Sequence, residues 1–260
     1  RAAVYIVTAK HVAKQLEDVP FGIRLNDKAG KYRIVSVDRG DWAKHPDNDV
    51  AVLRFDIPDW ADAGCFSKYF AVPFKRKTKN IGIGDLAYII GLFSLMHGNE
   101  RNLPIVHTGH IAMFPEGQKV AIKDSSTGEK VDIDAFLVEG QALSGASGAP
   151  VFVRRSIPTV VPDPGDQTHG LKAWVHGSLW LLGLWSASYA GSPSSELAEF
   201  KGVDSGSKVP YGVGVVVPSE KIIEVFEMPK LRDERDAEKK RHTETTAATT
   251  DSAASGDADT

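Results

Sequence analysis

Residues 143 to 152 read Leu143-Ser144-Gly145-Ala146-Ser147-Gly148-Ala149-Pro150-Val151-Phe152. A serine stands in a turn of small residues, and an apolar run typical of a strand follows at once. Small neighbours let the backbone turn sharply and approach another molecule closely. In such a turn the N–H groups of Gly145 and Ser147 can converge on one oxygen, as in an oxyanion hole. The stretch therefore predicts a nucleophilic serine at the entry to a strand.

Two upstream segments carry residues that could activate this serine. His11 follows a short strand pattern, Ile6-Val7-Thr8-Ala9, and Asp49 directly precedes the apolar run Val50-Ala51-Val52-Leu53. A serine hydroxyl is a poor nucleophile and needs an adjacent base. Histidine can accept that proton and return it, and a buried aspartate fixes the tautomer of the imidazole. Together, His11, Asp49 and Ser147 predict a catalytic triad.

Each triad residue also has an ordinary structural interpretation, and two have a competitor nearby. Alone, the histidine could be structural, the aspartate could begin a strand, and the serine could sit in a simple turn. Asp47 competes with Asp49, but only Asp49 directly precedes the apolar strand. Ser144 competes with Ser147, but the Gly-x-Ser-Gly-x-Pro frame centres on Ser147. The triad interpretation therefore depends on the three motifs occurring together.

Strand signals extend from these motifs over most of the chain. The 24 glycines and 14 prolines supply the turns that many short strands require. Residues 219–226 predict the clearest helix, with Ser219 as a possible N-cap. Residues 158–170 and 190–207 read as loops, and the polar end from residue 232 predicts disorder. The pattern predicts an all-β barrel or sandwich, with strands at residues 4–8, 22–25, 33–37, 50–55, 86–91, 105–114, 119–123, 135–139, 150–154, 179–186 and 212–217.

Composition excludes several classes of protein. The 260-residue chain has 31 Lys and Arg against 34 Asp and Glu, which is unlike the basic excess of a dedicated nucleic-acid binder. Its single cysteine excludes an intrachain disulfide framework and a CxxC metal site. No apolar run approaches the roughly 18–20 residues that span a membrane. Because the chain starts with Arg1 and enters a strand at once, we expect a fragment whose targeting signal, if any, lies upstream.

The order of His11, Asp49 and Ser147, with the motifs around them, resembles the trypsin-like serine peptidases of the chymotrypsin fold. Further segments agree in the same order. The motif style is nearest to bacterial HtrA-like catalytic domains, without their PDZ domain. The resemblance covers about residues 2–228, and its additional segments are residues 83–91, 106–111, 182–186 and 212–218.

This resemblance implies an all-β fold of two six-stranded antiparallel Greek-key barrels, at roughly residues 1–100 and 101–218. A C-terminal helix is expected at about residues 219–227, which completes a peptidase domain over residues 1–231. Residues 232–260 are expected to form a disordered tail. Since only about ten residues precede His11, we expect the first barrel to be incomplete at its N-terminus.

The resemblance also implies a serine endopeptidase that cleaves polypeptides and needs no cofactor or metal. His11 would act as general base and acid, Asp49 would orient it, and Ser147 would be the nucleophile. The N–H groups of Gly145 and Ser147 would form the oxyanion hole. Ala146 stands where activated zymogens carry an aspartate, so activation by N-terminal cleavage is not expected.

The primary specificity pocket is assigned from the same resemblance. Gln141 would lie at its base, Ser186, Ala187 and Ser188 would form one wall, and Gly212 would lie opposite. Because Gln141 is neutral, a preference for arginine or lysine is disfavoured. A neutral side chain of small to medium size is the expected substrate residue.

Other functions remain open to different degrees. A catalytically silent binding or sensor domain on the same fold is the main alternative, because a triad does not prove turnover. An α/β-hydrolase is disfavoured, since Pro150 fits a strand better than the helix required there. A metal site at His107 and His110 is also disfavoured, since no third ligand is nearby in sequence. The lone cysteine slightly favours a reducing cytoplasm, while the sequence leaves the location and the oligomeric state unknown.

Overall fold

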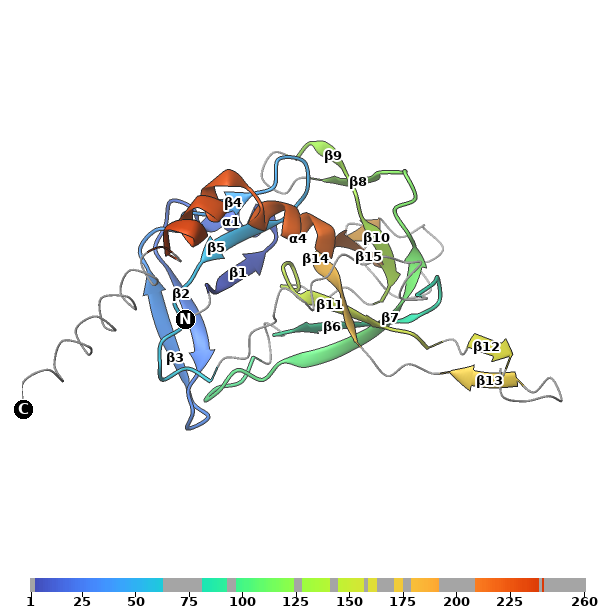
Figure 1. Cartoon of the computed structure of the whole chain (residues 1–260), viewed down its shortest axis with the longest axis horizontal. Helices are drawn as coiled ribbons and strands as arrows, with labels where there is room; N and C mark the ends of the chain where they lie inside the picture. The colour runs from blue at the N-terminus through green and yellow to red at the C-terminus, as the bar shows by residue number, and fades with distance from the viewer. Residues whose placement is uncertain are drawn as a thin grey trace, which may run out of the picture.

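The structure is a computed structural model. It describes residues 3–62, 81–92, 97–123, 128–140, 145–156, 159–162, 171–174, 179–191, 209–238 and 240. Strands dominate it, and helix α4 (Ser219–Phe226) lies across the sheets (Figure 1). Helix α1 (Lys10–Leu16) follows the first strand. The strands are β1 (Tyr5–Thr8), β2 (Phe21–Asn26), β3 (Tyr32–Val37), β4 (Ala43–Lys44), β5 (Ala51–Arg54), β6 (Leu86–Gly91), β7 (Ile105–Met113), β8 (Val120–Lys123), β9 (Lys130–Ile133), β10 (Phe136–Glu139), β11 (Pro150–Arg154), β12 (Thr159–Pro162), β13 (Leu171–Trp174), β14 (Trp180–Gly191) and β15 (Val209–Pro218).

The second half of the chain forms a closed antiparallel barrel in the order β10-β15-β14-β11-β6-β7. Its central strands are buried on both faces, because alternate side chains enter different cores. Val151, Val153 and Val216 belong to one hydrophobic cluster, to which all six strands contribute. Phe152 and Val215 belong to a second cluster, which also contains residues of α4 and of the N-terminal half. The predicted all-β class with a closed antiparallel barrel is confirmed.

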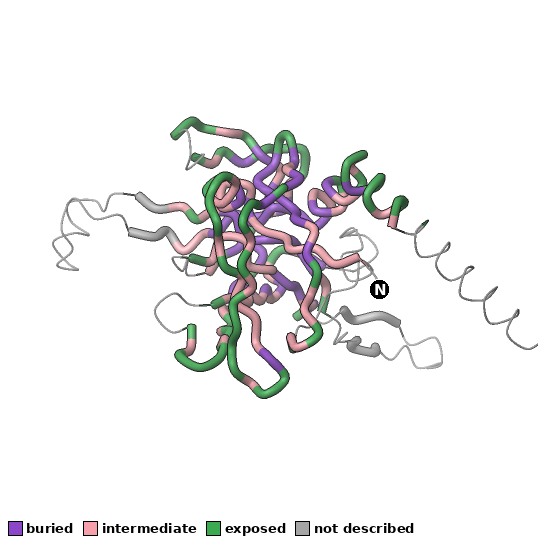
Figure 2. The backbone as a smooth tube through the Cα atoms, turned by 90° about the vertical axis from the view of Figure 1, so that its left-hand side faces the viewer, coloured by how far each residue is buried: buried purple, intermediate pink, exposed green. Residues whose placement is uncertain are grey.

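The N-terminal half contains a three-stranded sheet in the order β1-β5-β4 and the separate hairpin β2–β3. Strands β1 and β5 pair antiparallel, with Thr8 opposite Ala51. This register brings the end of β1 beside the start of β5. His11 follows β1 and Asp49 precedes β5, so the sheet places these two residues together. Buried residues concentrate at the centre of the molecule, where the two halves meet (Figure 2).

Several elements differ from the sequence prediction. The segment after β1 is helical, so His11 lies on α1 and not at a strand end. Pro218, and not Ser219, occupies the N-cap position of α4. Strand β12 forms within the predicted loop at residues 158–170, because pairing with β13 supplies its backbone hydrogen bonds.

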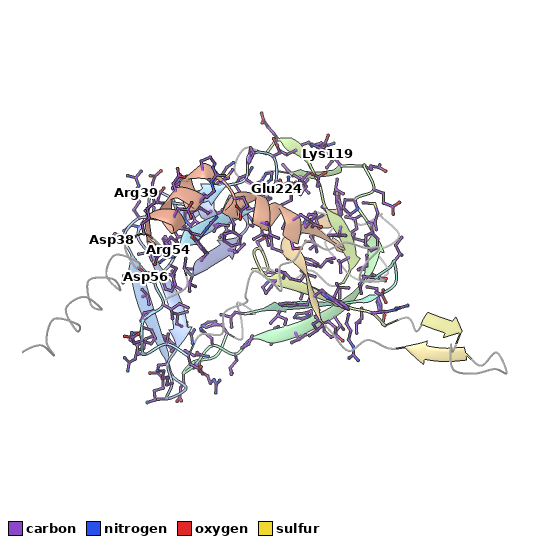
Figure 3. All side chains as sticks on the ribbon, in the orientation of Figure 1. Asp38, Arg39, Arg54, Asp56, Lys119 and Glu224 are labelled. Carbon is purple, nitrogen blue, oxygen red and sulfur yellow. The ribbon has the colours of Figure 1, made fainter. Side chains whose placement is uncertain are left out.

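After a turn at residues 227–228, a second helical segment covers residues 229–238, which extends beyond residue 232, where the sequence predicts disorder. Two contacts hold this segment against the domain. Leu231 is buried at 1% exposure, and Glu238 accepts a 3.0 Å hydrogen bond from Arg54. Arg54, the last residue of β5, also pairs with Asp56, which follows this strand (Figure 3). None of the helices in the described residues is long and apolar enough to cross a membrane.

Candidate active site

Asp49 fixes both the backbone and the ring of His11. Its Oδ1 accepts a 2.9 Å hydrogen bond from the His11 backbone N–H, and its Oδ2 lies 2.8 Å from His11 Nδ1. The backbone contact has a local reason. The N-cap residue of α1 is Ala9, whose side chain cannot accept a hydrogen bond. A carboxylate from the turn before β5 therefore satisfies a free amide at the helix start, where negative charge is favourable.

Ser186 on β14 connects Asp49 to the nucleophile candidate. The Ser186 hydroxyl donates a 2.5 Å hydrogen bond to Asp49 Oδ2. The Ser186 carbonyl accepts a 3.3 Å hydrogen bond from Ser147 Oγ. The sequence interpretation gave Ser186 a place in the pocket wall, whereas its side chain is 1% exposed and faces the aspartate. The family resemblance alone did not indicate a contact between Ser186 and Asp49.

Asp49 is held as a carboxylate. Burial by itself raises the pKa of Asp49, but hydrogen bonds from His11 and Ser186, with the charge of His11, lower this pKa below its usual range. His11 Nδ1 therefore faces an acceptor and carries a proton, which leaves Nε2 free to act as a base.

The lowered pKa predicts how the stability contribution of Asp49 changes with pH. A depressed folded-state pKa gives stabilisation above the unfolded value of about 3.9, which is lost as pH falls through the folded value. Urea unfolding of wild type and Asp49→Asn at pH 6 and pH 3 checks this. We expect the advantage of wild type to shrink at pH 3. An advantage that grows on acidification would contradict the assignment.

The nucleophile turn is fixed by the backbone of Trp185. The Gly148 N–H donates to the Trp185 carbonyl at 2.7 Å, and the Trp185 N–H donates to the Ala149 carbonyl at 2.9 Å. The Ala149 N–H closes the turn onto the Ala146 carbonyl, also at 2.9 Å. These bonds extend the pairing of β11 with β14 into the turn. The position of Ser147 is thus set by the barrel.

Two amides of the turn are left available. Within the described part of the chain, the N–H groups of Gly145 and Ser147 have no acceptor, whereas those of Gly148 and Ala149 do. Gly145 has a φ of +88°, which glycine adopts without strain. The two amides that the sequence assigned to an oxyanion hole are therefore free of those backbone bonds. Their role in catalysis remains a prediction.

Gly148 is the point at which the nucleophile turn meets the strand that precedes His11. Its φ is +88°, and a Cβ at this position would lie 2.4 Å from Thr8 Oγ1 and 3.3 Å from the Ala9 backbone nitrogen. Only glycine allows this approach. Ser147 and His11 are thereby brought near each other by a contact between main chains.

Replacing Gly148 with alanine is expected to destabilise the fold by about 2–4 kcal/mol, because left-handed strain adds to the steric overlap with Thr8. Activity should fall by about 10²-fold as Ser147 is displaced. Gly117→Ala is the matched control, since Gly117 has a φ of +74° with nothing within 4 Å of its Cβ position. Thermal unfolding and substrate hydrolysis measure both. Equal effects of the two substitutions would refute the contact argument.

In the described site, the Ser147 hydroxyl is not hydrogen-bonded to His11, the residue that would accept its proton. Ser147 Oγ donates to the Ser186 carbonyl, and no hydrogen bond joins it to His11 among the residues that the structure describes. In unliganded enzymes catalytic hydrogen bonds are often long, and they tighten in the substrate complex. Proton transfer to His11 would require the hydroxyl to exchange the Ser186 carbonyl for His11 Nε2 as its acceptor.

A cavity of about 300 Å³ opens beside His11 and Asp49. This volume is at the lower end for ligand clefts. The lining comes from α1, the β4–β5 turn, the β8–β9 hairpin and β14: Lys10, His11, Pro46, Asp47, Asn48, Asp49, Ile122, Lys123, Val131, Ile133, Ser186 and Ala187. The hairpin contributes three apolar side chains and Lys123, and the lining is polar beside the two catalytic candidates.

The residues predicted for the primary pocket are only partly placed. Ala187 lines the cavity beside His11, and Ser188 is exposed. Gly212 lies on β15, where its carbonyl accepts a 2.8 Å hydrogen bond from the Gly140 N–H. Gln141, the predicted base, lies outside the described residues. The specificity pocket therefore remains a prediction.

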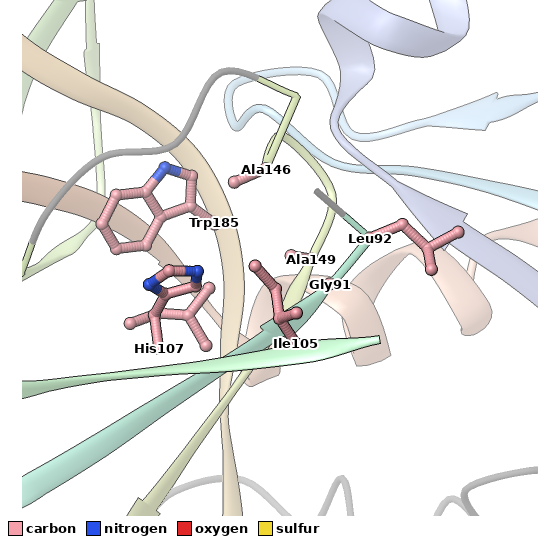
Figure 4. A pocket seen from close by; sticks show the side chains of 8 residues that line it. Gly91, Leu92, Ile105, His107, Ala146, Ala149 and Trp185 are labelled. Carbon is pink, nitrogen blue, oxygen red and sulfur yellow. The ribbon is translucent and has the colours of Figure 1, made fainter. Parts of the chain in front are cut away.

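A second cavity lies behind the nucleophile turn (Figure 4). It is lined by Ala146, Ala149, Trp185 and His107, among others, and has a volume of about 20 Å³. That volume holds about one water molecule, so it cannot receive a substrate side chain. Ala146 also packs against the apolar core of the barrel. Within the described residues, no three His, Cys, Asp or Glu side chains gather to hold a metal ion.

Comparisons with known proteins show which family the chain belongs to. The active form of the Rv3671c protease from M. tuberculosis is similar over 84% of this chain and 83% of its own, with 11% identity and a TM-score of 0.35. No curated protein matches the chain by sequence. The family model of the trypsin-like peptidase domain matches residues 1–156, which is more than half of the chain and includes His11, Asp49 and Ser147. The chain therefore belongs to the family of trypsin-like peptidase domains.

Proposed function

We propose that the protein is a serine endopeptidase that hydrolyses polypeptides through His11, Asp49 and Ser147. One observation carries the proposal: Asp49 binds both the backbone and the ring of His11, while Ser186 joins the same carboxylate to Ser147. His11 and Ser186 thus meet at one carboxylate, and Ser147 is connected to it through the Ser186 backbone, in a peptidase-family domain.

The mechanism follows from the direction of the hydrogen bonds. With its Nδ1 proton held by Asp49, His11 accepts the Ser147 proton at Nε2 while Ser147 Oγ attacks the substrate carbonyl carbon. The carbonyl oxygen becomes an oxyanion, which the N–H groups of Gly145 and Ser147 stabilise. The C–N bond then breaks, and His11 gives its proton to the departing amine. Water, deprotonated by His11, hydrolyses the resulting acyl-enzyme ester and regenerates Ser147.

The substrate pocket is proposed as neutral. Gln141 at its base, with Ala187, Ser188 and Gly212 around it, offers no carboxylate to a basic side chain. A desolvated ammonium or guanidinium would be left without a counter-charge, which is costly. Cleavage of a peptide library is expected after small to medium neutral residues. Dominant cleavage after arginine or lysine would overturn this pocket assignment while leaving the triad intact.

A fluorophosphonate probe tests the function itself. The probe reacts with an activated serine, so folded wild type should be labelled and heat-unfolded wild type should not. Labelling confined to the folded protein supports the peptidase.

The second candidate is a catalytically silent binding domain on the same fold. The observation that favours it is the Ser147 hydroxyl, which is bonded to Ser186 and not to His11. Folded protein that resists the probe and cleaves no library peptide would establish this alternative.

A further inference from the structure

His45 is a buried histidine close to the proposed triad, with no part in the peptidase mechanism. It lies four residues before Asp49 in the turn between β4 and β5, and it is 5% exposed. A buried imidazole needs partners for both of its nitrogens. The structure supplies them from two different parts of the chain.

The Nδ1 atom of His45 accepts hydrogen bonds from two backbone amides. The Asp47 N–H lies at 3.1 Å and the Asn48 N–H at 3.0 Å. An atom that accepts two N–H groups carries no proton, so the proton of the neutral ring is on Nε2. The ring thus holds the two residues that directly precede Asp49.

The Nε2 atom of His45 donates to helix α4. Its partner is Glu224 Oε2 at 2.8 Å, and Glu224 lies on the helix that crosses the sheets (Figure 3). Burial tends to raise the pKa of Glu224, but hydrogen bonds from His45 and Lys221 lower this pKa overall, so the acceptor remains a carboxylate. Lys221 in turn pairs with Asp134 at 3.3 Å. This chain of contacts fixes the plane of the imidazole.

Other contacts hold the rest of the turn. Lys10 Nζ donates to the carbonyls of His45 and Pro46 at 2.9 and 3.0 Å. Asn48 Oδ1 accepts a 3.0 Å bond from the Asp134 N–H. His45 differs from these partners because it acts on the amides that immediately precede the carboxylate. A change at Nδ1 is therefore transmitted over only one or two residues to Asp49.

We propose that His45 is a positioning residue that sets the orientation of Asp49, with Nδ1 as the atom that does so. The inference rests on the proposed peptidase function. Without an acceptor at Nδ1, two backbone amides lose their partner, one of them in the buried residue Asn48, and the turn must shift to satisfy them. Asp49 would then no longer present both oxygens to His11. His45 does not itself line the cavity beside His11, whereas Asp47 and Asn48, which its Nδ1 holds, do. Its loss should therefore lower kcat more than it changes KM.

Two substitutions test the two ring nitrogens of His45 separately. Asparagine places an oxygen near the position of Nδ1, so His45→Asn retains the acceptor and loses the donor to Glu224. Glutamine places its NH₂ near Nε2, so His45→Gln retains the donor and loses the acceptor. Each variant removes one of the two ring interactions, so a general loss of stability should affect both.

The expected result is a large difference between these variants. His45→Asn should keep kcat within about threefold of wild type, and His45→Gln should lose about 10- to 100-fold, with KM changed by less than about threefold. Hydrogen exchange gives a readout that needs no activity. The amides of Asp47 and Asn48 should stay protected in wild type and His45→Asn, and exchange faster in His45→Gln.

Equal kcat and equal amide protection in the two variants would overturn the role of Nδ1. Equal loss of kcat in both, with matching losses of thermal stability, would reduce His45 to a structural residue and also overturn it. Wild-type protein with no activity is a different failure. In that case the proposed function fails, and the exchange data still show whether His45 holds the turn.

Discussion

Replacing Ser147 with alanine is expected to lower kcat for peptide hydrolysis by about 10⁶-fold. In the proposed mechanism the substitution removes the atom that forms the acyl-enzyme bond, which closes the covalent route. The fold should survive, because the turn is held by backbone bonds with Trp185, and among the described residues the Ser147 hydroxyl has a single hydrogen bond, of 3.3 Å, to the Ser186 carbonyl. Activity and thermal unfolding should therefore separate clearly.

Ser144→Ala is the matched control for this prediction. Ser144 is three residues from Ser147 and also precedes a glycine, so it tests whether the frame has been assigned to the correct serine. We expect its kcat to stay within about threefold of wild type, as for a change that leaves the transition state untouched. Loss of activity in Ser144→Ala with retention in Ser147→Ala would move the nucleophile to Ser144.

Asp49→Asn should lower kcat by about 10⁴-fold while largely preserving the fold. An asparagine Oδ1 can still accept from the His11 backbone N–H, so the start of α1 keeps its cap. The amide NH₂ would face His11 Nδ1, however, and two donors cannot pair. The ring would then place its proton on Nε2, which is the atom that must accept the proton of Ser147. Substrate hydrolysis at neutral pH measures the effect.

Asp47→Asn distinguishes this mechanism from a simple loss of negative charge. Asp47 also lines the cavity beside His11, and its side chain is exposed. Like Asp49→Asn, the substitution Asp47→Asn removes one negative charge, but at a position two residues before Asp49. We expect a change of kcat below about threefold. If the two asparagine variants lost activity equally, the specific contact between Asp49 and His11 would not explain the effect.

The strand pattern and the triad motifs could be recognised from the sequence. The predicted ranges 86–91 and 150–154 match β6 and β11, and the predicted helix at 219–226 matches α4. These segments carry local signals, because apolar residues recur with the period of the element and turn residues bound them. The motifs also singled out two residues that are in contact, since His11 Nδ1 lies 2.8 Å from Asp49 Oδ2.

Other features depend on contacts between distant segments. The predicted strand end at His11 is a helix because Asp49, 38 residues away, supplies the cap that Ala9 lacks. The partner of His45 is 179 residues distant, so nothing near His45 in sequence indicates it. Ser186 was assigned to a pocket wall, and its bond to Asp49 arises from the meeting of β14 with the N-terminal half. Local pattern contains no information about such pairs.

The central claim is that Ser147 attacks the substrate with His11 as its base. Mass spectrometric mapping of a trapped acyl-enzyme tests it most directly. Wild-type protein is mixed with an activated peptide ester, quenched in acid after a few milliseconds, digested and sequenced. The account predicts one acyl group, on Ser147, that is absent from the Ser147→Ala protein. An acyl group on another residue, or turnover of the ester with Ser147 unmodified, would contradict it.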